Sequence, residues 1–206
     1  MNAAQSALFF HDARAVFEEH LSELSRLDAL LGDGDHGVSM LKGFTSIEQS
    51  MEQKTFDSVS DQFRNAGHIL MREIGGTCGP LFTVLFMAGA AAFENKEDIT
   101  TPDFALMFRS AADSVMKLGN CKAGDKTMVD AMVPAAESLL KSSAAGEDVK
   151  TALAKAYEAA KAGAEATRDM RCVKGRGRYQ GDKSLGCQDA GATSVSLILF
   201  ALANNV

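Results

Sequence analysis

Three aspartates near the end of the first apolar pattern have the side chains and the spacing to bind a cation. Asp28, Asp33 and Asp35 fall within eight residues, and only Gly34 separates Asp33 from Asp35. Carboxylates this close repel one another unless a cation or several hydrogen-bond donors lie among them. Oxygen ligands of this kind suit Mg²⁺, which binds one or two carboxylates and keeps water or phosphate oxygens as its other ligands. We therefore predict a metal site at these three residues.

An acidic turn that caps the next helix is the competing interpretation, because aspartate is common both in turns and at helix N-caps. An EF-hand loop is excluded. No further acidic residue follows Asp35 until Glu48, which lies outside a twelve-residue calcium loop begun at Asp28 or Asp33. The choice between a metal site and a simple turn depends on the rest of the chain.

Glycine-containing interruptions recur at four expected helix junctions, although a helix C-cap needs only one glycine. At three of them a helix begins within a residue or two of the last glycine. Its free N–H groups and the positive end of its dipole then face the loop, which is how backbones bind phosphate. The segment 75–80, with the hydroxyl of Thr77, is one such candidate, but it lacks the spacing of a Walker A loop. The four junctions span residues 32–37, 75–80, 124–127 and 181–193.

A basic segment, Arg168 to Lys183, holds six lysines and arginines in sixteen residues, with three glycines among them. On a chain of net charge −6 such a cluster indicates a local anion site. A solvated basic loop is the competing interpretation. Carboxylates, phosphate-binding helix starts and guanidinium groups in one protein together favour a nucleotide site.

Helices must position these loops, because apolar residues repeat at three- and four-residue steps through most of the chain. Abundant alanine, only three prolines and no tryptophan also favour an all-α fold over strands. Segment 80–93, apolar nearly all round, predicts a central helix, and Pro134 predicts a kink. The hydroxyl of Thr100 as an N-cap, followed by Pro102, clearly predicts the start of a helix. The expected helices span residues 3–27, 37–53, 57–74, 80–93, 101–118, 128–139, 147–167 and 191–204.

Composition excludes several classes of protein. The chain has 206 residues, of which 46% are hydrophobic and 23% charged, and it contains no linker. This composition predicts a single globular domain. Its negative charge argues against binding nucleic acid or an anionic membrane. Four dispersed cysteines indicate neither a zinc ribbon nor a disulfide framework. The absence of a secretory signal and of an apolar run of about 18 residues predicts a cytoplasmic protein with no membrane partner.

In their order along the chain, the motifs resemble those of the nucleotide-binding L subunits of dihydroxyacetone kinase, the DhaL family. The resemblance is carried by Leu27-Asp28, by Gly186, and by segments 32–37, 75–82, 124–128, 174–176, 188–189 and 191–194. It implies a closed barrel of about eight antiparallel amphipathic helices with the nucleotide at one end, which agrees with the expected helix count. Residues 1–206 would then form a single DhaL-type nucleotide-binding domain.

The resemblance also implies a site. Asp28, Asp33 and Asp35 would bind two Mg²⁺ ions that bridge the phosphates of ADP or ATP, and no certain catalytic residue is implied. The residues expected to line or enclose the nucleotide are His36, Gly37, Val38, Ser39, Thr77, Cys78, Gly119, Met128, Arg176, Asp189, Ala190 and Gly191. The chain departs from the usual family residues at Cys78, Thr83, Arg178, Cys187 and Ala190. At position 78 the family usually has serine.

The implied function is that of a kinase subunit, which supplies the phosphoryl donor for dihydroxyacetone (glycerone) or a related ketose. A K-type partner subunit would hold the substrate, and a homodimer is expected. Two donors stay open: ADP rephosphorylated by a phosphocarrier of the phosphotransferase system, or ATP that exchanges at each turnover. An alternative is a nucleotide-dependent regulatory module that binds a transcription factor or another partner. A helical domain with a degenerate site is a third.

Overall fold

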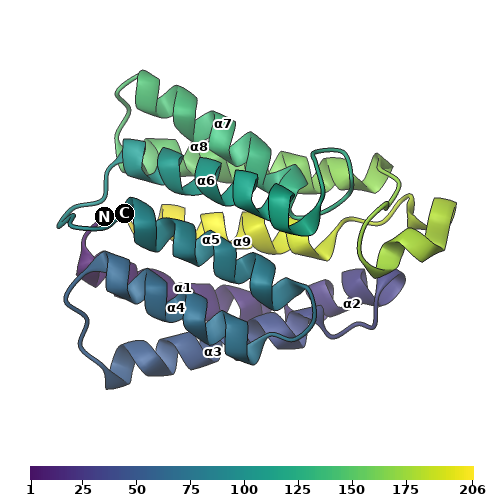
Figure 1. Ribbon diagram of the computed structural model, residues 1–206, viewed down its shortest axis with the longest axis horizontal. Helices are drawn as coiled ribbons and strands as arrows, with labels where there is room; N and C mark the ends of the chain where they lie inside the picture. Colours follow the sequence, from purple (N-terminus) through teal and green to yellow (C-terminus); the bar gives the residue numbers. More distant parts are fainter.

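The computed structural model describes residues 1–206 and contains nine α-helices, two 3₁₀ helices and no strand (Figure 1). This confirms the all-α prediction. The elements are α1 (Ala3–Glu19), α2 (Leu21–Leu31), α3 (His36–Gln53), α4 (Val59–Glu73), α5 (Cys78–Ala92), α6 (Thr101–Gly119), α7 (Val129–Ala144), α8 (Val149–Ala166), η1 (Thr167–Asp169), η2 (Arg176–Ser184) and α9 (Ala190–Asn204). No helix combines the length and the apolar run that a membrane span requires.

Eight helices form a closed wall. Each packs on the next in the order α1, α3, α4, α5, α6, α7, α8 and α9, and α9 packs back on α1. Neighbours in this wall run antiparallel (Figure 1). Helix α2 continues α1 beyond the wall and packs on α3, α9 and η2. The predicted closed barrel of antiparallel helices is therefore confirmed.

The antiparallel order places every second helix start at the same end of the barrel. Helices α3, α5, α7 and α9 all begin at the right-hand end in Figure 1, whereas both chain termini lie at the left-hand end. Each of these four starts lies within or just after one of the glycine-containing junctions. The loops singled out in the sequence therefore meet at one end because of the helix order alone.

Aromatic side chains fill the inside of the barrel. Phe63 of α4 lies at the centre of this group, with its ring centroid 5.3 Å from that of Phe10, 5.7 Å from Phe86 and 4.9 Å from Phe93. They belong to one cluster of 48 buried hydrophobic residues. Burial of each phenylalanine stabilises the fold by roughly 1.5–3 kcal/mol. The interior is thus a packed core that holds the wall helices in register.

Helices α4 and α6 both begin with side-chain caps, and the cap at Thr100 is the one that the sequence predicts. Ser58 Oγ accepts a hydrogen bond of 3.1 Å from the Asp61 N–H at the start of α4. At α6, the Asp103 carboxylate accepts the Thr100 N–H at 2.9 Å in a capping box, with Pro102 in the first turn. Each cap satisfies backbone donors that have no partner within the helix.

The first predicted helix is bent at His20, which separates α1 from α2. His20 has φ −94° and ψ 8° and lies between the two helices. Helical hydrogen bonds nevertheless continue across it, from His20 N to Val16 O and from Leu24 N to His20 O, both 3.0 Å long. The chain therefore changes direction without a loop, and α2 is free to pack on η2.

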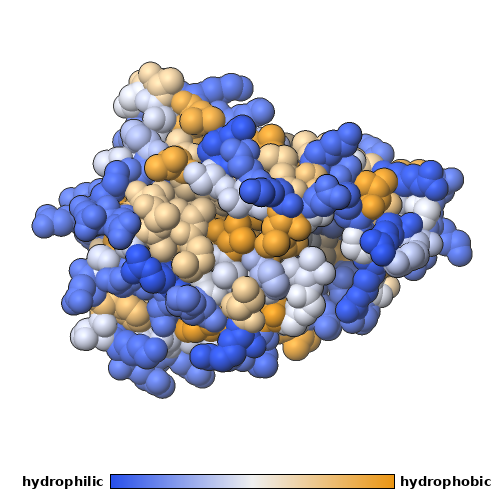
Figure 2. Space-filling view, in the orientation of Figure 1, coloured by the Kyte–Doolittle hydropathy of each residue, from blue (hydrophilic) through white to orange (hydrophobic).

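The prediction that segment 80–93 forms a central helix is wrong. Helix α5 lies in the wall, where Leu81, Val84 and Met87 stay partly exposed on its outer side. Figure 2 shows apolar residues gathered along this face over α5. A closed barrel has no central helix, so an evenly apolar sequence here buries one face and leaves the other at the surface.

Pro134 lies inside α7, which runs unbroken from Val129 to Ala144. Proline has no N–H to bond the carbonyl four residues earlier, that of Asp130. Gly163 of α8 packs against this same carbonyl, where a Cβ at position 163 would lie 2.1 Å from the oxygen. The proline thus marks a close approach of two wall helices.

Candidate functional site

The three predicted metal ligands lie together at the end of the barrel where α3 begins. Asp28 is in the last turn of α2, and Asp33 and Asp35 are in the loop before α3. One oxygen from each carboxylate lies within 4.8 Å of the others. The Gly34 N–H donates to Asp28 Oδ2 at 2.8 Å from a left-handed conformation with φ +79°. A Cβ at Gly32 would lie 2.4 Å from Asp28 Oδ1. Both glycines are thus needed to fold the loop over Asp28.

The charges in this cluster are poorly balanced by the protein itself. The guanidinium of Arg176, from η2, pairs with Asp33 and lowers the pKa of that carboxyl. Burial, together with the neighbouring charges of Asp33 and Asp28, raises the pKa of Asp35. One arginine faces three carboxylates, and all the donor atoms are carboxylate oxygens. This donor set fits a hard divalent cation such as Mg²⁺.

The starts of α3 and α5 have backbone N–H groups available for an anion. Their N-cap residues, Asp35 and Thr77, make no side-chain capping hydrogen bond. Thr77 is exposed. At α9, by contrast, the Asp189 carboxylate accepts the Ala192 N–H at 2.7 Å. The positive ends of α3 and α5 can therefore hold phosphate oxygens close to the aspartate cluster.

A buried histidine joins three of the helix starts. His36, only 4% exposed, has Nε2 2.8 Å from Ser194 Oγ and Nδ1 3.8 Å from Cys78 Sγ. Burial lowers the pKa of His36, and burial with the nearby charges of Asp189 and Asp28 raises the pKa of the Cys78 thiol to about 12. Both side chains are neutral near pH 7. They fix α3, α5 and α9 relative to one another rather than supply charge. The sequence did not single out Ser194 as a site residue.

Several of the other predicted residues lie around the same end. A Cβ at Gly191 would lie 3.5 Å from the Cβ of Met128, so the starts of α9 and α7 are adjacent. Val38 is 56% exposed, whereas Ala190 is buried and Ser39 partly buried. The predicted nucleotide residues thus fall on all four helix starts.

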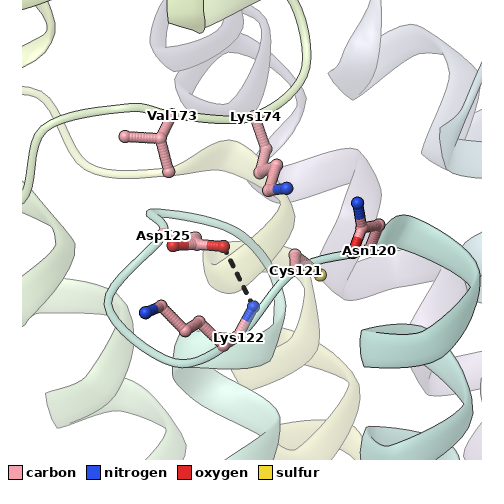
Figure 3. A pocket seen from close by; sticks show the side chains of 6 residues that line it. All are labelled: Asn120, Cys121, Lys122, Asp125, Val173 and Lys174. Carbon is pink, nitrogen blue, oxygen red and sulfur yellow. Dashed lines mark hydrogen bonds between the residues drawn. The ribbon is translucent and has the colours of Figure 1, made fainter.

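Gly119 ends α6 beside a cleft of about 410 Å³ that lies between two loops (Figure 3). The Lys174 side chain extends from one loop toward the other, in which the Lys122 N–H donates to Asp125 Oδ2 at 3.0 Å. No sequence pattern indicated this cleft, because its two sides come from distant segments. Its lining residues are Asn120, Cys121, Lys122, Asp125, Val173 and Lys174.

Asp130 and Lys126 shape the loop before α7, and neither was predicted as a site residue. The Asp130 carboxylate accepts the Gly124 N–H at 2.5 Å and the Thr127 N–H at 2.7 Å. Lys126 is 1% exposed and points into the protein. A carboxylate one turn into a helix is a recognisable loop-capping signal, whereas nothing in the sequence marks a lysine as buried.

Comparison with known proteins identifies the family. Residues 30–204 match the family described as the DAK2 domain. The chain belongs to this family. The resemblance seen in the sequence motifs is thereby confirmed.

Relatives of this DAK2-family chain extend over most of its length. It is 37% identical over 188 residues to the PEP-dependent dihydroxyacetone kinase, ADP-binding subunit DhaL, of Escherichia coli, covering 91% of this chain and 90% of that one. It is 35% identical over 186 residues to the D-erythrulose kinase of Mycolicibacterium smegmatis, covering 89% of this chain and 32% of that one.

A solved structure has the same fold. The dihydroxyacetone kinase from C. freundii in complex with AMP-PNP and Mg²⁺ superimposes with a TM-score of 0.75 at 25% identity. The match covers 100% of this chain and 34% of that one. The DAK2-family chain therefore spans about a third of the length of this kinase and of the erythrulose kinase.

Proposed function

We propose that this chain is the Mg²⁺-dependent, nucleotide-binding subunit of a kinase that phosphorylates dihydroxyacetone or a related ketose held by a K-type partner subunit. Residues 1–206 act as one domain in this proposal. The observation that carries it is the meeting of the aspartate cluster, the uncapped starts of α3 and α5 and the Arg176 guanidinium at one end of the barrel. The kinase names of the relatives support the same function.

In this proposal Asp28, Asp33 and Asp35 hold two Mg²⁺ ions. Bound there, the ions neutralise charge on the phosphates during transfer. Arg176, exposed and paired with Asp33, exchanges that carboxylate for a phosphate oxygen when the aspartates take up metal. The N–H groups at the starts of α3 and α5 orient the phosphates. None of these residues moves a proton, so their part is electrostatic.

The rest of the nucleotide lies among the residues that the four helix starts bring together. Residues 36–39 and 77–78 would hold the phosphates and ribose, and the turn 189–191 would enclose them together with Arg176. Gly119 and Met128 enclose the remaining part of the nucleotide, because Gly119 adjoins the cleft and Met128 adjoins Gly191. A hydroxyl of the substrate on the partner subunit would then attack the γ-phosphate of bound ATP in line, with ADP as the leaving group.

We propose ADP, kept as a resident cofactor and rephosphorylated by a phosphocarrier, as the nucleotide. The E. coli relative is named as an ADP-binding subunit of a PEP-dependent enzyme, which supports this donor over exchanging ATP. Purified protein is expected to retain ADP through dialysis, as detected by mass spectrometry of the denatured sample. Loss of all nucleotide on dialysis would favour ATP. A homodimer and a cytoplasmic location stay predictions.

Substitution of the metal ligands tests the proposed function. Asp33→Asn and Asp35→Asn are each expected to weaken the affinity for Mg·ADP, measured by calorimetry. The loss should exceed the roughly 10- to 100-fold that follows when a residue that only hydrogen-bonds a metal ligand is removed. Asp57→Asn, an exposed aspartate before α4 at the other end of the barrel, is the matched control. Circular dichroism checks that each variant is folded. Unchanged affinity in either folded ligand variant would refute the proposal.

A further inference from the structure

Lys126 is a buried lysine whose ammonium group is surrounded by backbone carbonyls. Its Nζ lies 2.8 Å from the carbonyl oxygen of Thr167, 3.3 Å from that of Met170, 2.6 Å from that of Ser184 and 2.5 Å from that of Cys187, and its three N–H groups are shared among these four acceptors. The side chain is 1% exposed, and no carboxylate lies within ion-pair distance of it. A buried charge is costly unless it is hydrogen-bonded. Here main-chain carbonyls supply the hydrogen bonds, and the carboxylates of Asp189 and Asp169 act on the ammonium from beyond ion-pair distance.

The backbone at Lys126 also has an uncommon conformation. Its φ of +60° lies in the left-handed region, which residues other than glycine rarely adopt. Such a conformation persists only where the surrounding contacts require it. This backbone conformation directs the Lys126 side chain into the protein, where its ammonium meets the four carbonyls.

The four carbonyls come from both ends of one excursion of the chain. Residues 167–187 leave the end of α8, form η1 and η2, and return just before α9. Weaker ties also join the two ends of this excursion, among them Gly186 N to Arg168 O at 2.8 Å and Cys172 N to Ser184 Oγ at 2.9 Å. Lys126, which lies outside the excursion, is the group that contacts both of its ends at once.

This excursion carries Arg176 to the aspartate cluster. Apart from that ion pair, Arg176 is exposed, and an exposed ion pair contributes little to holding a loop in place. The position of the guanidinium therefore depends on the packing of η2 on α2, where Gly177 lies close to Leu31, and on how the excursion is anchored at its base. The loop 124–127 that carries Lys126 leads directly into Met128, so the same lysine connects two parts of the proposed nucleotide site.

We infer that Lys126 is a positioning residue for nucleotide binding: its ammonium closes the base of the 167–187 excursion and thereby holds Arg176 beside Asp33. The part of this inference that concerns nucleotide binding rests on the proposed function. Without the ammonium, the four carbonyls lose their shared donor and must be hydrated, so the base opens. The effect passes through Arg176, because Lys126 itself points away from the site.

The test uses Lys126→Met in the full chain, with Lys161→Met, an exposed lysine on α8, as the matched control. Lys126→Met is expected to raise the Kd for Mg·ADP by about tenfold or more, as removal of a residue that orients a metal ligand does. It should also speed hydrogen exchange at the amides of Cys172 and Gly186, with helical circular dichroism unchanged. Unchanged exchange at these amides would overturn the inference.

A double-mutant cycle with Arg176→Ala separates positioning from a general structural role. If Lys126 acts through Arg176, the loss of affinity caused by Lys126→Met should shrink to about threefold or less in the Arg176→Ala background. An equal loss in both backgrounds would overturn the inference. If Lys126→Met does not fold, Lys126→Gln keeps two donors and should give exchange rates above those of the wild type; wild-type rates in it would overturn the inference.

Failure of the proposed function is distinguishable from failure of this inference. A wild-type chain that binds no Mg·ADP refutes the proposed function by itself. The exchange of Cys172 and Gly186 in the Lys126 variants requires no nucleotide, so it tests the anchoring of the excursion in either case.

Discussion

Gly37 allows a direct test of whether a glycine of the aspartate loop serves packing between helices. It is the second residue of α3 and is buried against α2. A Cβ at this position would lie 2.3 Å from the carbonyl oxygen of Leu21 and 2.6 Å from Ser25 Oγ. The carbonyl is backbone, so Gly37→Ala requires α2 to shift as a whole.

The expected magnitude follows from two opposing terms. Overpacking a well-packed site costs about 1–3 kcal/mol, while alanine gains up to about 1 kcal/mol over glycine in a helix. Because the clash is with backbone, the cost falls in the upper part of this range, about 2–3 kcal/mol, and the net loss of unfolding free energy is about 1–2 kcal/mol. For a chain of this size, each kcal/mol lowers Tm by about 2–4 °C, so a fall of about 2–8 °C is expected. A shift of α2 also moves Asp28 away from Asp35, so binding of Mg·ADP should weaken in the same variant.

Thermal unfolding followed by circular dichroism measures the stability, and calorimetry with Mg·ADP measures the binding. Gly75→Ala is the control for stability alone, because nothing lies within 4 Å of a Cβ built there. Its Tm should equal that of the wild type. A Gly37→Ala protein with the Tm of the wild type would refute the packing argument, whatever its affinity for nucleotide.

Two further predictions concern side chains at the helix starts. Burial raises the pKa of Asp189 to about 6; the folded chain therefore keeps this proton to higher pH than the unfolded chain, and stability falls by up to about 3 kcal/mol as pH rises from about 4 to 6. Asp189→Asn, which keeps the N-cap acceptor, should remove this fall, and an unchanged difference in urea midpoint between pH 4.5 and 6.5 would contradict it. Cys78→Ser replaces a weak donor by a hydroxyl and should tighten Mg·ADP binding about 2- to 10-fold by calorimetry; weaker binding would count against a phosphate contact there.

Local signals in the sequence predicted the features that depend on neighbouring residues. The start of α6 was predicted because Thr100 caps an N–H group only three residues away. The aspartate cluster was predicted for the same reason, since its three members lie within eight residues. Such features are settled largely by the chain near them, so tertiary packing does not change them.

Features that depend on distant contacts could not be predicted from spacing. Lys126 binds carbonyls 41 to 61 residues away, and His36 bonds Ser194 across 158 residues. The bend at His20 has no proline or glycine to signal it. Arg176 was associated with the aspartates only through the family resemblance, because no periodicity connects η2 to the end of α2. The outward face of α5 was missed because an evenly apolar sequence does not show which side is buried.

The antiparallel order of the wall helices also determines where this barrel can be attached to other protein. Both termini and the connections α3–α4, α5–α6 and α7–α8 lie at the end opposite the aspartate cluster (Figure 1). Fusion of another domain at either terminus, or growth of those connections, therefore leaves the four helix starts in place. The relatives show that such fusion is compatible with the fold, since the matching part makes up 32% of the D-erythrulose kinase and 34% of the C. freundii kinase. The same architecture can thus be built as a separate subunit or as one module of a longer enzyme.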